Sequence, residues 1–280
     1  MSEVADSDWS RWWVKPPYRF EMGLHRGDGR FFENTLDAPK LLAERAHWLQ
    51  SNPERYAAVL PEGEPLLAEA MEWAAALNPS GRLPAFRPDE SALDRCHWLG
   101  KQWEPDFLLL RPDNAGFRLV AACVCFPSSW ALAEKMGLPV DEIHGVVPRL
   151  NPELGSKIQA FLAAMRPGSD WERVNWGLAA TPELNLHPAR RLPRLNEEAS
   201  LASTWFRLER QALRALPRSG GILFGLRIQV WPLCDLVSSS PAAQTFRQLL
   251  ETMPEEIAEY KGLSAARPAL IRGLAAVGSR

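Results

Sequence analysis

One histidine of this sequence, His144, stands where a metal-binding side chain would be useful. It follows a short predicted helix and has apolar or small neighbours: Ile143, Gly145, Val146 and Val147. A neutral imidazole binds iron well, and histidine is a common proximal ligand of haem. Apolar neighbours would form a wall beside a macrocycle, and a glycine would let the backbone approach it closely. A histidine hydrogen-bonded at a helix–loop junction would produce the same pattern, because a lone histidine specifies no metal site.

A second candidate, Arg227, interrupts the otherwise apolar strand that alternation predicts over residues 221–231. A buried guanidinium must find an anion or several acceptors. Arg227 could therefore contact a ligand, pair structurally with Glu209, or lie on a solvated face of the sheet. Glu209 belongs to the segment RLERQ (207–211), where helical spacing predicts a solvated helix face with a few intrahelical ion pairs.

The cysteines indicate packing rather than chemistry. Cys123 and Cys125 share one face of a predicted apolar strand, where free cysteines behave as small hydrophobic residues. A nucleophile–base pair of Cys125 with His144 lacks a neighbouring cation or carboxylate that would lower the pKa of the thiol. Zinc binding by Cys123 and Cys125 lacks the second close pair of ligands that a structural site needs. No glycine-rich phosphate loop, HExxH or GxSxG motif occurs.

The composition favours a soluble globular protein of a reducing compartment. The 280 residues can bury a substantial core, and a formal net charge of −2 without a basic stripe gives no footprint for nucleic acid. The N-terminus lacks an apolar signal region, and no apolar run has the length of a membrane span. We therefore expect a cytoplasmic protein without nucleic-acid or membrane partners. The 12 tryptophans suit a core or the lining of a pocket for a flat apolar ligand, and Trp130 and Trp176 are candidates for either role.

The elements that must position these residues are both helices and strands. Apolar spacing predicts helices over residues 40–50, 64–77, 128–136, 153–165 and 201–216, and from about 241 onwards. Strand patterns cover residues 106–111, 118–126, 173–179 and 221–231. Residues 1–39 are expected to be irregular, and a proline-rich polar loop with a breaker at 78–81 is expected to reach about residue 100. A strand pair, a helical excursion and returning strands together predict an α+β fold with an antiparallel sheet.

Several stretches of the chain occur in the order typical of one family. They are FEMGL (20–24), CFPSSW (125–130), EKMGLP (134–139), Ile143-His144 with Pro148, RVNW (173–176), RLERQ (207–211), LPRSG (216–220) and LFGLR (223–227). Together they cover about residues 18–235. They resemble the α subunit of haem-dependent oxidative N-demethylase and the wider group of proteins around it.

The resemblance implies a PAS-like core, an antiparallel sheet with flanking helices that encloses haem b. The core would span 101–235, with an irregular and helical N-terminal extension (1–100) and a helical C-terminal extension (236–280), all packed as one unit. In that family the enzyme oxidises a small secondary amine, with dimethylamine the known substrate, using O₂ and releasing formaldehyde. Electrons come from NADPH, and the flavin, the [2Fe–2S] cluster and the folate site lie on separate subunits.

The resemblance also implies roles for single residues. His144 becomes the proximal ligand of the haem iron. The side chains expected beside the haem are Ile143, Val146, Trp130 and Trp176. Arg227 becomes the candidate for a distal group that polarises bound O₂ or contacts substrate, and Glu209 could balance the charge of an amine cation.

Three short stretches depart from the family pattern. Glu104-Pro105-Asp106 stands where the family has Gln-Glu-Asp, Ile228-Gln229 where Thr-Tyr is expected, and Gly145-Val146-Val147 where Ala-Pro-Val is usual. All of them spare His144, so we expect haem binding, while the choice of amine or turnover itself could change. Two alternatives stay open. One is a haem PAS sensor of gas or redox state that signals through a partner, and the other is a scaffold without haem.

Overall fold

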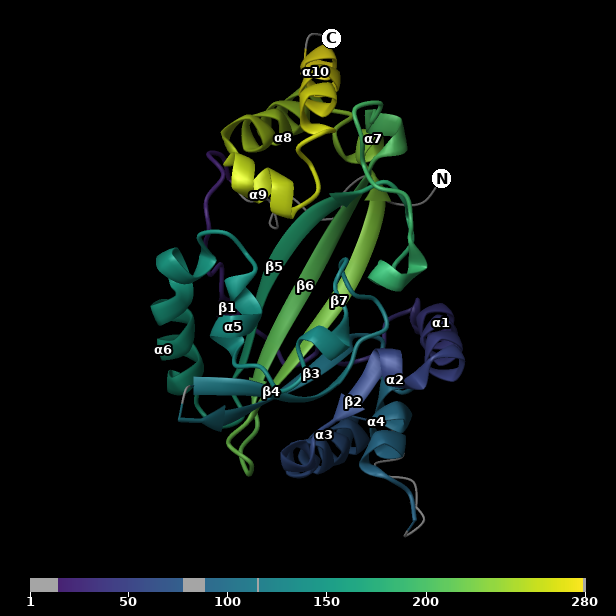
Figure 1. Ribbon diagram of the computed structural model, residues 1–280, viewed down its shortest axis with the longest axis vertical. Coiled ribbons are helices and arrows are strands. Elements are labelled where there is room, and N and C mark those ends of the chain that lie inside the picture. Colours follow the sequence, from purple (N-terminus) through teal and green to yellow (C-terminus); the bar gives the residue numbers. More distant parts are fainter. Residues whose placement is uncertain (1–14, 78–88, 115, 279–280) are drawn as a thin grey trace.

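One seven-stranded sheet runs through the computed structural model, which describes residues 15–77, 89–114 and 116–278 (Figure 1). Its strands are β1 (His25–Arg26), β2 (Ala57–Val59), β3 (Asp106–Asp113), β4 (Gly116–Cys123), β5 (Asp170–Ala179), β6 (Trp205–Ala215) and β7 (Ile222–Pro232). They lie in the order β1-β5-β6-β7-β3-β4-β2, and every neighbouring pair is antiparallel. Because β7 pairs with both β6 and β3, the first hairpin and the returning strands share one sheet, and the predicted α+β class is confirmed.

Helices cover the sheet in three groups (Figure 1). The first group is α1 (Ala38–Ser51), α2 (Pro53–Tyr56), α3 (Glu64–Leu77) and α4 (Ala92–Gly100). The second is α5 (Val140–Gly145) and α6 (Ser156–Ala164), and the third is α7 (Leu233–Leu236), α8 (Ser240–Thr252), α9 (Glu255–Tyr260) and α10 (Arg267–Gly278), gathered at one end of β5–β7. None of the described helices is both long and apolar enough to cross a membrane.

Side-chain alternation divides the sheet into two faces. The α5 face carries Arg173, Asn175, Glu209, Gln211 and Leu226, which the strand register places side by side. It packs under α5 and α6 through an apolar cluster that includes Leu213, Leu226 and Ile143. The α3 face carries Ala212, Gly225 and Arg227, and its cluster joins β3 and β6 to α3 and α4. Farther along the same face, Trp176 packs under the C-terminal helices.

The helix predicted over residues 201–216 is wrong, since this segment forms β6, between β5 and β7. Its strand alternation is hidden because Arg210 and Arg214 occupy positions on the apolar α3 face. Arg210 pairs with Glu172, and the Arg214 guanidinium lies 4.4 Å from the ring centroid of Trp73. Two arginines in an apolar alternation leave only the helical spacing visible in the sequence.

Other elements differ in smaller ways. Only a 3₁₀ turn (Leu132–Glu134) forms in the predicted helix 128–136, where Ser129 has a positive φ of 64°. The predicted helix 153–165 is a π-helical turn (Asn151–Gly155) followed by α6. Helix α4 forms where a loop was expected, and its start carries a capping box of Ser91 and Asp94 that the sequence does contain. The predicted breaker at 78–81 lies outside the described residues.

Candidate functional site

Helix α5 is fastened to β4 by the segment that leads into it. The backbone N–H of Leu119 donates to Leu138, that of Gly137 donates back to Leu119, and Arg118 forms a bridge with Pro139, the residue before α5. Ile143 packs against the apolar cluster beneath the helix. His144 follows it in the last turn of α5 and is half-buried. The apolar neighbour thus anchors the helix and sets the position of the imidazole.

The imidazole of His144 is held neutral. Burial, together with the cations Arg173 and Lys135, lowers the pKa of His144 to about 4. No described residue forms a hydrogen bond with the ring, so its lone pair is available to a metal ion. Val146, close by in the chain, is 57% exposed and is one of three large apolar residues that are exposed among the described residues. A neutral imidazole beside an uncovered apolar side chain is the surrounding that a haem ligand needs.

We expect this neutrality to appear as a pH dependence of stability. The pKa of His144 is about 4 in the folded chain against an ordinary 6.5, so the unfolded chain binds the extra proton between these values. The contribution of the neutral His144 to the free energy of unfolding is complete above pH 6.5 and is lost as the pH falls through about 4. It is on the order of 2 kcal/mol, because one pKa unit corresponds to about 1.4 kcal/mol and solvent screens a half-buried ring.

Urea unfolding of haem-free wild type and His144→Gln, at neutral pH and near the folded pKa, measures this difference. The wild type should lose more free energy of unfolding on acidification than the variant. An identical loss in both proteins would contradict a neutral, buried imidazole.

A cluster of polar side chains occupies the α5 face near His144. Arg173 and Asn175 of β5 lie opposite Gln211 and Glu209 of β6. Asn175 is exposed in the middle of its strand, so the described residues leave this part of the sheet uncovered. Gln211 donates its side-chain amide to Glu209, while the Nε of Arg173 is buried without a partner among the described residues. An unpaired buried donor beside a neutral histidine marks a place where an anionic group would bind.

Lys261, directly after α9, adds a further cation to this cluster. Its Nζ donates to the backbone oxygen of Trp176 over 2.7 Å. Burial lowers the pKa of Lys261 to about 8, an effect that Glu209 opposes and Arg173 reinforces. The C-terminal segment therefore contributes a titratable group to the same region as β5 and β6.

Arg227 lies on the other face of the sheet. Its guanidinium pairs with Glu104 and donates to the backbone oxygen of Phe31 over 2.9 and 2.8 Å. Gly225 allows this arrangement, because a Cβ there would stand 2.5 Å from the ring of Phe32. The structure therefore brings Arg227 together with Glu104 rather than with Glu209 or His144.

The two candidate tryptophans are separated as well. Trp176 is buried on the face opposite Arg173, where its ring stacks on Phe206 at 6.1 Å and meets Phe246 edge-on at 5.7 Å. Trp130 is half-buried and packs against the same apolar cluster as Ile143. Of these two candidates, Trp130 is thus the one on the His144 side of the sheet.

Sequence reasoning missed Arg173 and Lys261, and also Ser128 and Arg207, which connect to Glu209 because Arg207 donates to Ser128 and Ser128 donates to Glu209. The missing signal is an alternation of polar residues: Arg207, Glu209 and Gln211 occur at every second position, as do Arg173 and Asn175. A polar row of period two points to one face of a strand, but the helical interpretation of 201–216 concealed it.

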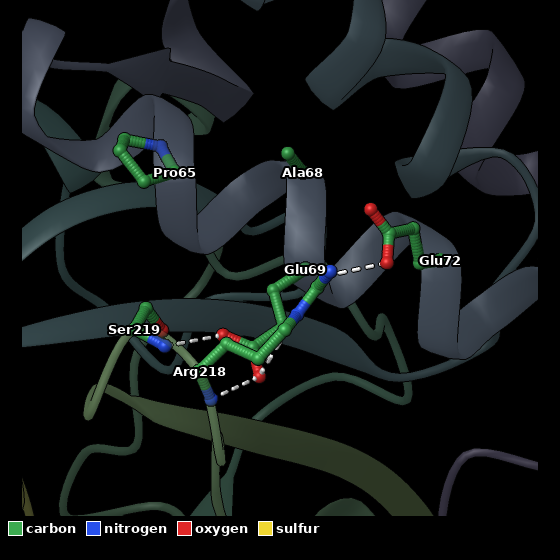
Figure 2. Close-up of a pocket in the computed structure, with 6 residues that line it drawn as sticks. All are labelled: Pro65, Ala68, Glu69, Glu72, Arg218 and Ser219. Carbon is green, nitrogen blue, oxygen red and sulfur yellow. Dashed lines mark hydrogen bonds and ion pairs between the residues drawn. The ribbon is translucent and has the colours of Figure 1, made fainter.

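A pocket at the turn between β6 and β7 is lined by residues that hold this turn in place (Figure 2). There the carboxylate of Glu69 accepts the backbone N–H of Arg218 over 2.9 Å and of Ser219 over 2.8 Å, and Arg218 pairs with Glu72. These contacts fasten the LPRSG turn to α3 and leave its charges paired. Within the described ranges, no group of three or more His, Cys, Asp and Glu side chains is placed to hold a metal ion.

Comparison with known families gives one match. The model of a family described as haem-dependent oxidative N-demethylase, alpha subunit-like, matches residues 39–271. The matched range includes β2–β7, α5 with His144, and Lys261.

Proposed function

The chain belongs to the haem-dependent oxidative N-demethylase, alpha subunit-like family, and on this premise we propose that it binds haem b and oxidises a small secondary amine with O₂, releasing formaldehyde. The observation that carries the proposal is the neutral, unpartnered imidazole of His144 beside an unpaired donor of Arg173. These groups match the iron and the carboxylates of haem respectively.

The residues around His144 fit a bound haem. His144 would ligate the iron, and Ile143, Val146 and Trp130 would cover its apolar surface and keep water away. Arg173 and Lys261 would pair with the carboxylates at the haem edge. Bound haem would supply the activation of O₂ and accept electrons from the amine.

Glu209 is the residue we assign to the amine. Its carboxylate lies on the α5 face with Arg173 and is partly open to solvent. A carboxylate oxygen there would accept an N–H of the ammonium form, hold the amine in place, and take up the proton that must leave before oxidation. The neutral amine would then lose two electrons and one methyl proton, with O₂ as the oxidant, and hydrolysis of the resulting iminium would yield formaldehyde and the shorter amine. Arg227 contacts Glu104 on the other face, so Glu209 carries the substrate role in this proposal.

We further propose that residues 101–235 form a PAS-like core, with 1–100 and 236–280 as extensions. The strand order supports this, since β3 lies centrally between its hairpin partner β4 and the last strand β7, with β6 and β5 beyond. The first extension adds β1 and β2 at the two edges. Flavin, [2Fe–2S] and folate would reside on partner subunits, which supply electrons.

Reconstitution with hemin tests the proposal. Wild-type protein should give a sharp Soret band that shifts when dithionite and CO are added, and should release formaldehyde from dimethylamine under O₂ with a chemical reductant. A Soret band that responds to CO without formaldehyde from any secondary amine would support the sensor alternative. Absence of a Soret band with ample hemin would refute haem binding and leave the scaffold.

A further inference from the structure

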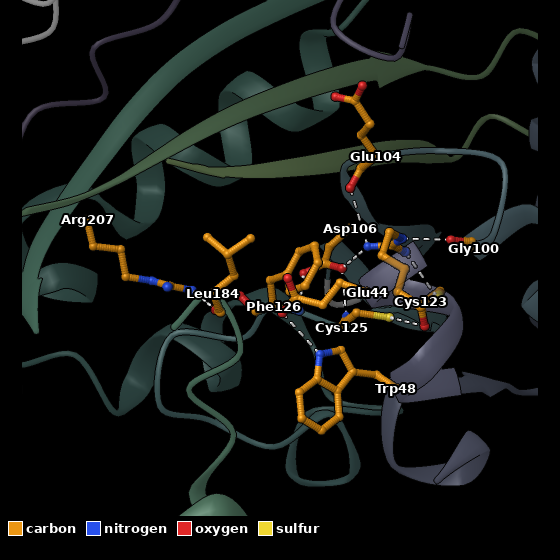
Figure 3. Close-up of polar contacts among 11 residues, drawn as sticks. Glu44, Trp48, Gly100, Glu104, Asp106, Cys123, Cys125, Phe126, Leu184 and Arg207 are labelled. Carbon is orange, nitrogen blue, oxygen red and sulfur yellow. Dashed lines mark hydrogen bonds and ion pairs between the residues drawn. The ribbon is translucent and has the colours of Figure 1, made fainter. Parts of the chain in front are cut away.

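The segment that follows β4 is fixed from one side by a buried ion pair (Figure 3). Asp106 accepts the backbone N–H of Cys125 over 2.6 Å and of Phe126 over 2.9 Å. Asp106 is itself paired with Arg45, and both side chains are excluded from solvent. The backbone entering Ser128 therefore has a defined position before any ligand binds.

A second arginine, Arg207, holds the same segment from the other side. Its side chain is 4% exposed, and its Nη2 donates to the backbone oxygens of Phe126 over 2.8 Å and Leu184 over 2.7 Å (Figure 3). Its Nη1 donates to the backbone oxygen of Glu183 over 3.2 Å. Arg207 forms no direct ion pair with any residue of the described ranges, so its charge is compensated by carbonyl groups and by what its Nε contacts.

The Nε contact is with the hydroxyl of Ser128. Arg207 Nε lies 2.9 Å from Ser128 Oγ, and Ser128 Oγ lies 3.2 Å from Glu209 Oε2. A guanidinium can only donate, so the serine oxygen accepts from Arg207 and its own O–H donates to Glu209. The direction of both hydrogen bonds follows from this. Gln211 donates to the other carboxylate oxygen, so both oxygens of Glu209 are oriented.

The Glu209 carboxylate is thus linked through Ser128 to the buried guanidinium of Arg207, and it lies at a part of the sheet that is open to solvent. Arg207 is enclosed by protein, whereas Glu209 is partly exposed beside the exposed Asn175. Ser128 lies between them, in the CFPSSW stretch, and none of the haem contacts proposed above uses it. A structural ion pair would place the guanidinium directly on the carboxylate. A hydroxyl between them leaves the carboxylate able to bind a second cation.

We propose that Ser128 and Arg207 are positioning residues that hold the Glu209 carboxylate, in its charged form, for binding the ammonium group of the substrate. This inference rests on the proposed function. Arg207 never contacts the amine, and its effect reaches Glu209 through the hydroxyl of Ser128. Arg45, through Asp106, and Arg207 hold residues 125–128 from either side and keep this hydroxyl within reach of both Arg207 and Glu209.

The test compares Ser128→Ala and Ser128→Thr in the hemin-loaded protein, with dimethylammonium as the probe. Amine binding is followed by the change in the Soret band, and hemin affinity is measured separately. Ser128→Ala should bind the amine about tenfold more weakly, because a hydrogen bond to a charged group is lost. Ser128→Thr keeps the hydroxyl and should restore the affinity for the amine.

The controls separate this inference from the proposed function. Ser156→Ala, an exposed serine at the start of α6, should match the wild type in both measurements. Glu209→Gln should weaken amine binding. Unchanged amine binding in Ser128→Ala, with Glu209→Gln impaired, would overturn the relay and leave the function standing. Loss of the Soret band in Ser128→Ala alone would also overturn it, and loss in the wild type would refute the function and the relay together.

Discussion

Hemin added to His144→Ala should fail to give the Soret band that it gives with the wild-type protein. The imidazole of His144 is neutral and is the ligand proposed for the iron, so its removal would leave a bound haem without that ligand. Loss of residues that merely orient a metal ligand costs about 10–100-fold in affinity, so loss of the ligand itself should exceed about 100-fold. Titration of hemin into both proteins, followed at the Soret maximum, measures the difference.

An exposed histidine provides the matched control. His47→Ala, on α1, should bind hemin as the wild type does. In His144→Gly, added free imidazole should restore part of the Soret band by occupying the vacated position. Identical spectra for His144→Ala and the wild type would place the axial ligand elsewhere. His97, whose Nε2 is buried without a partner among the described residues, and the buried His187 would then be examined.

Arg45→Met should be strongly destabilising, although Arg45 lies outside the proposed haem site. Arg45 and Asp106 have side-chain exposures of 0% and 1%. Removal of one partner leaves an uncompensated buried charge, which costs about 3–5 kcal/mol. Arg45 also donates to the backbone oxygen of Gly100 over 2.7 Å, so the end of α4 loses a contact as well. Urea unfolding at constant m-value measures the loss of unfolding free energy.

An exposed pair serves as the comparison. Glu251→Gln removes a partner of Arg247 on α8, where both side chains are open to solvent, and should change stability by less than about 1 kcal/mol. The double variant Arg45→Met, Asp106→Leu should remain unstable, because the backbone N–H groups of Cys125 and Phe126 lose their acceptor. A loss below about 1 kcal/mol in Arg45→Met would contradict the interpretation of this pair as a support of the segment.

Part of the candidate site could be predicted from the sequence because its signals are local. The hairpin of β3 and β4 shows two apolar strands around a turn sequence, and His144 stands in a motif that continues through Pro148. Hydrophobic spacing and turn residues depend on near neighbours in the chain, so they are visible without a fold. The family was recognised from the order of the motifs, and the resemblance implies His144 as the iron ligand.

The sequence by itself determined the β3–β4 hairpin, the main helices and the choice of His144 as a candidate, since each of these rests on residues that are close together in the chain. Only the tertiary structure decided which polar residues meet. Segment 205–215 is a strand because β5 and β7 supply its hydrogen bonds on both sides. Glu209 lies opposite Ile228, so Arg227, one residue away, faces the other side of the sheet. A strand turns every second side chain to the same face, and its register is set by partners distant in sequence.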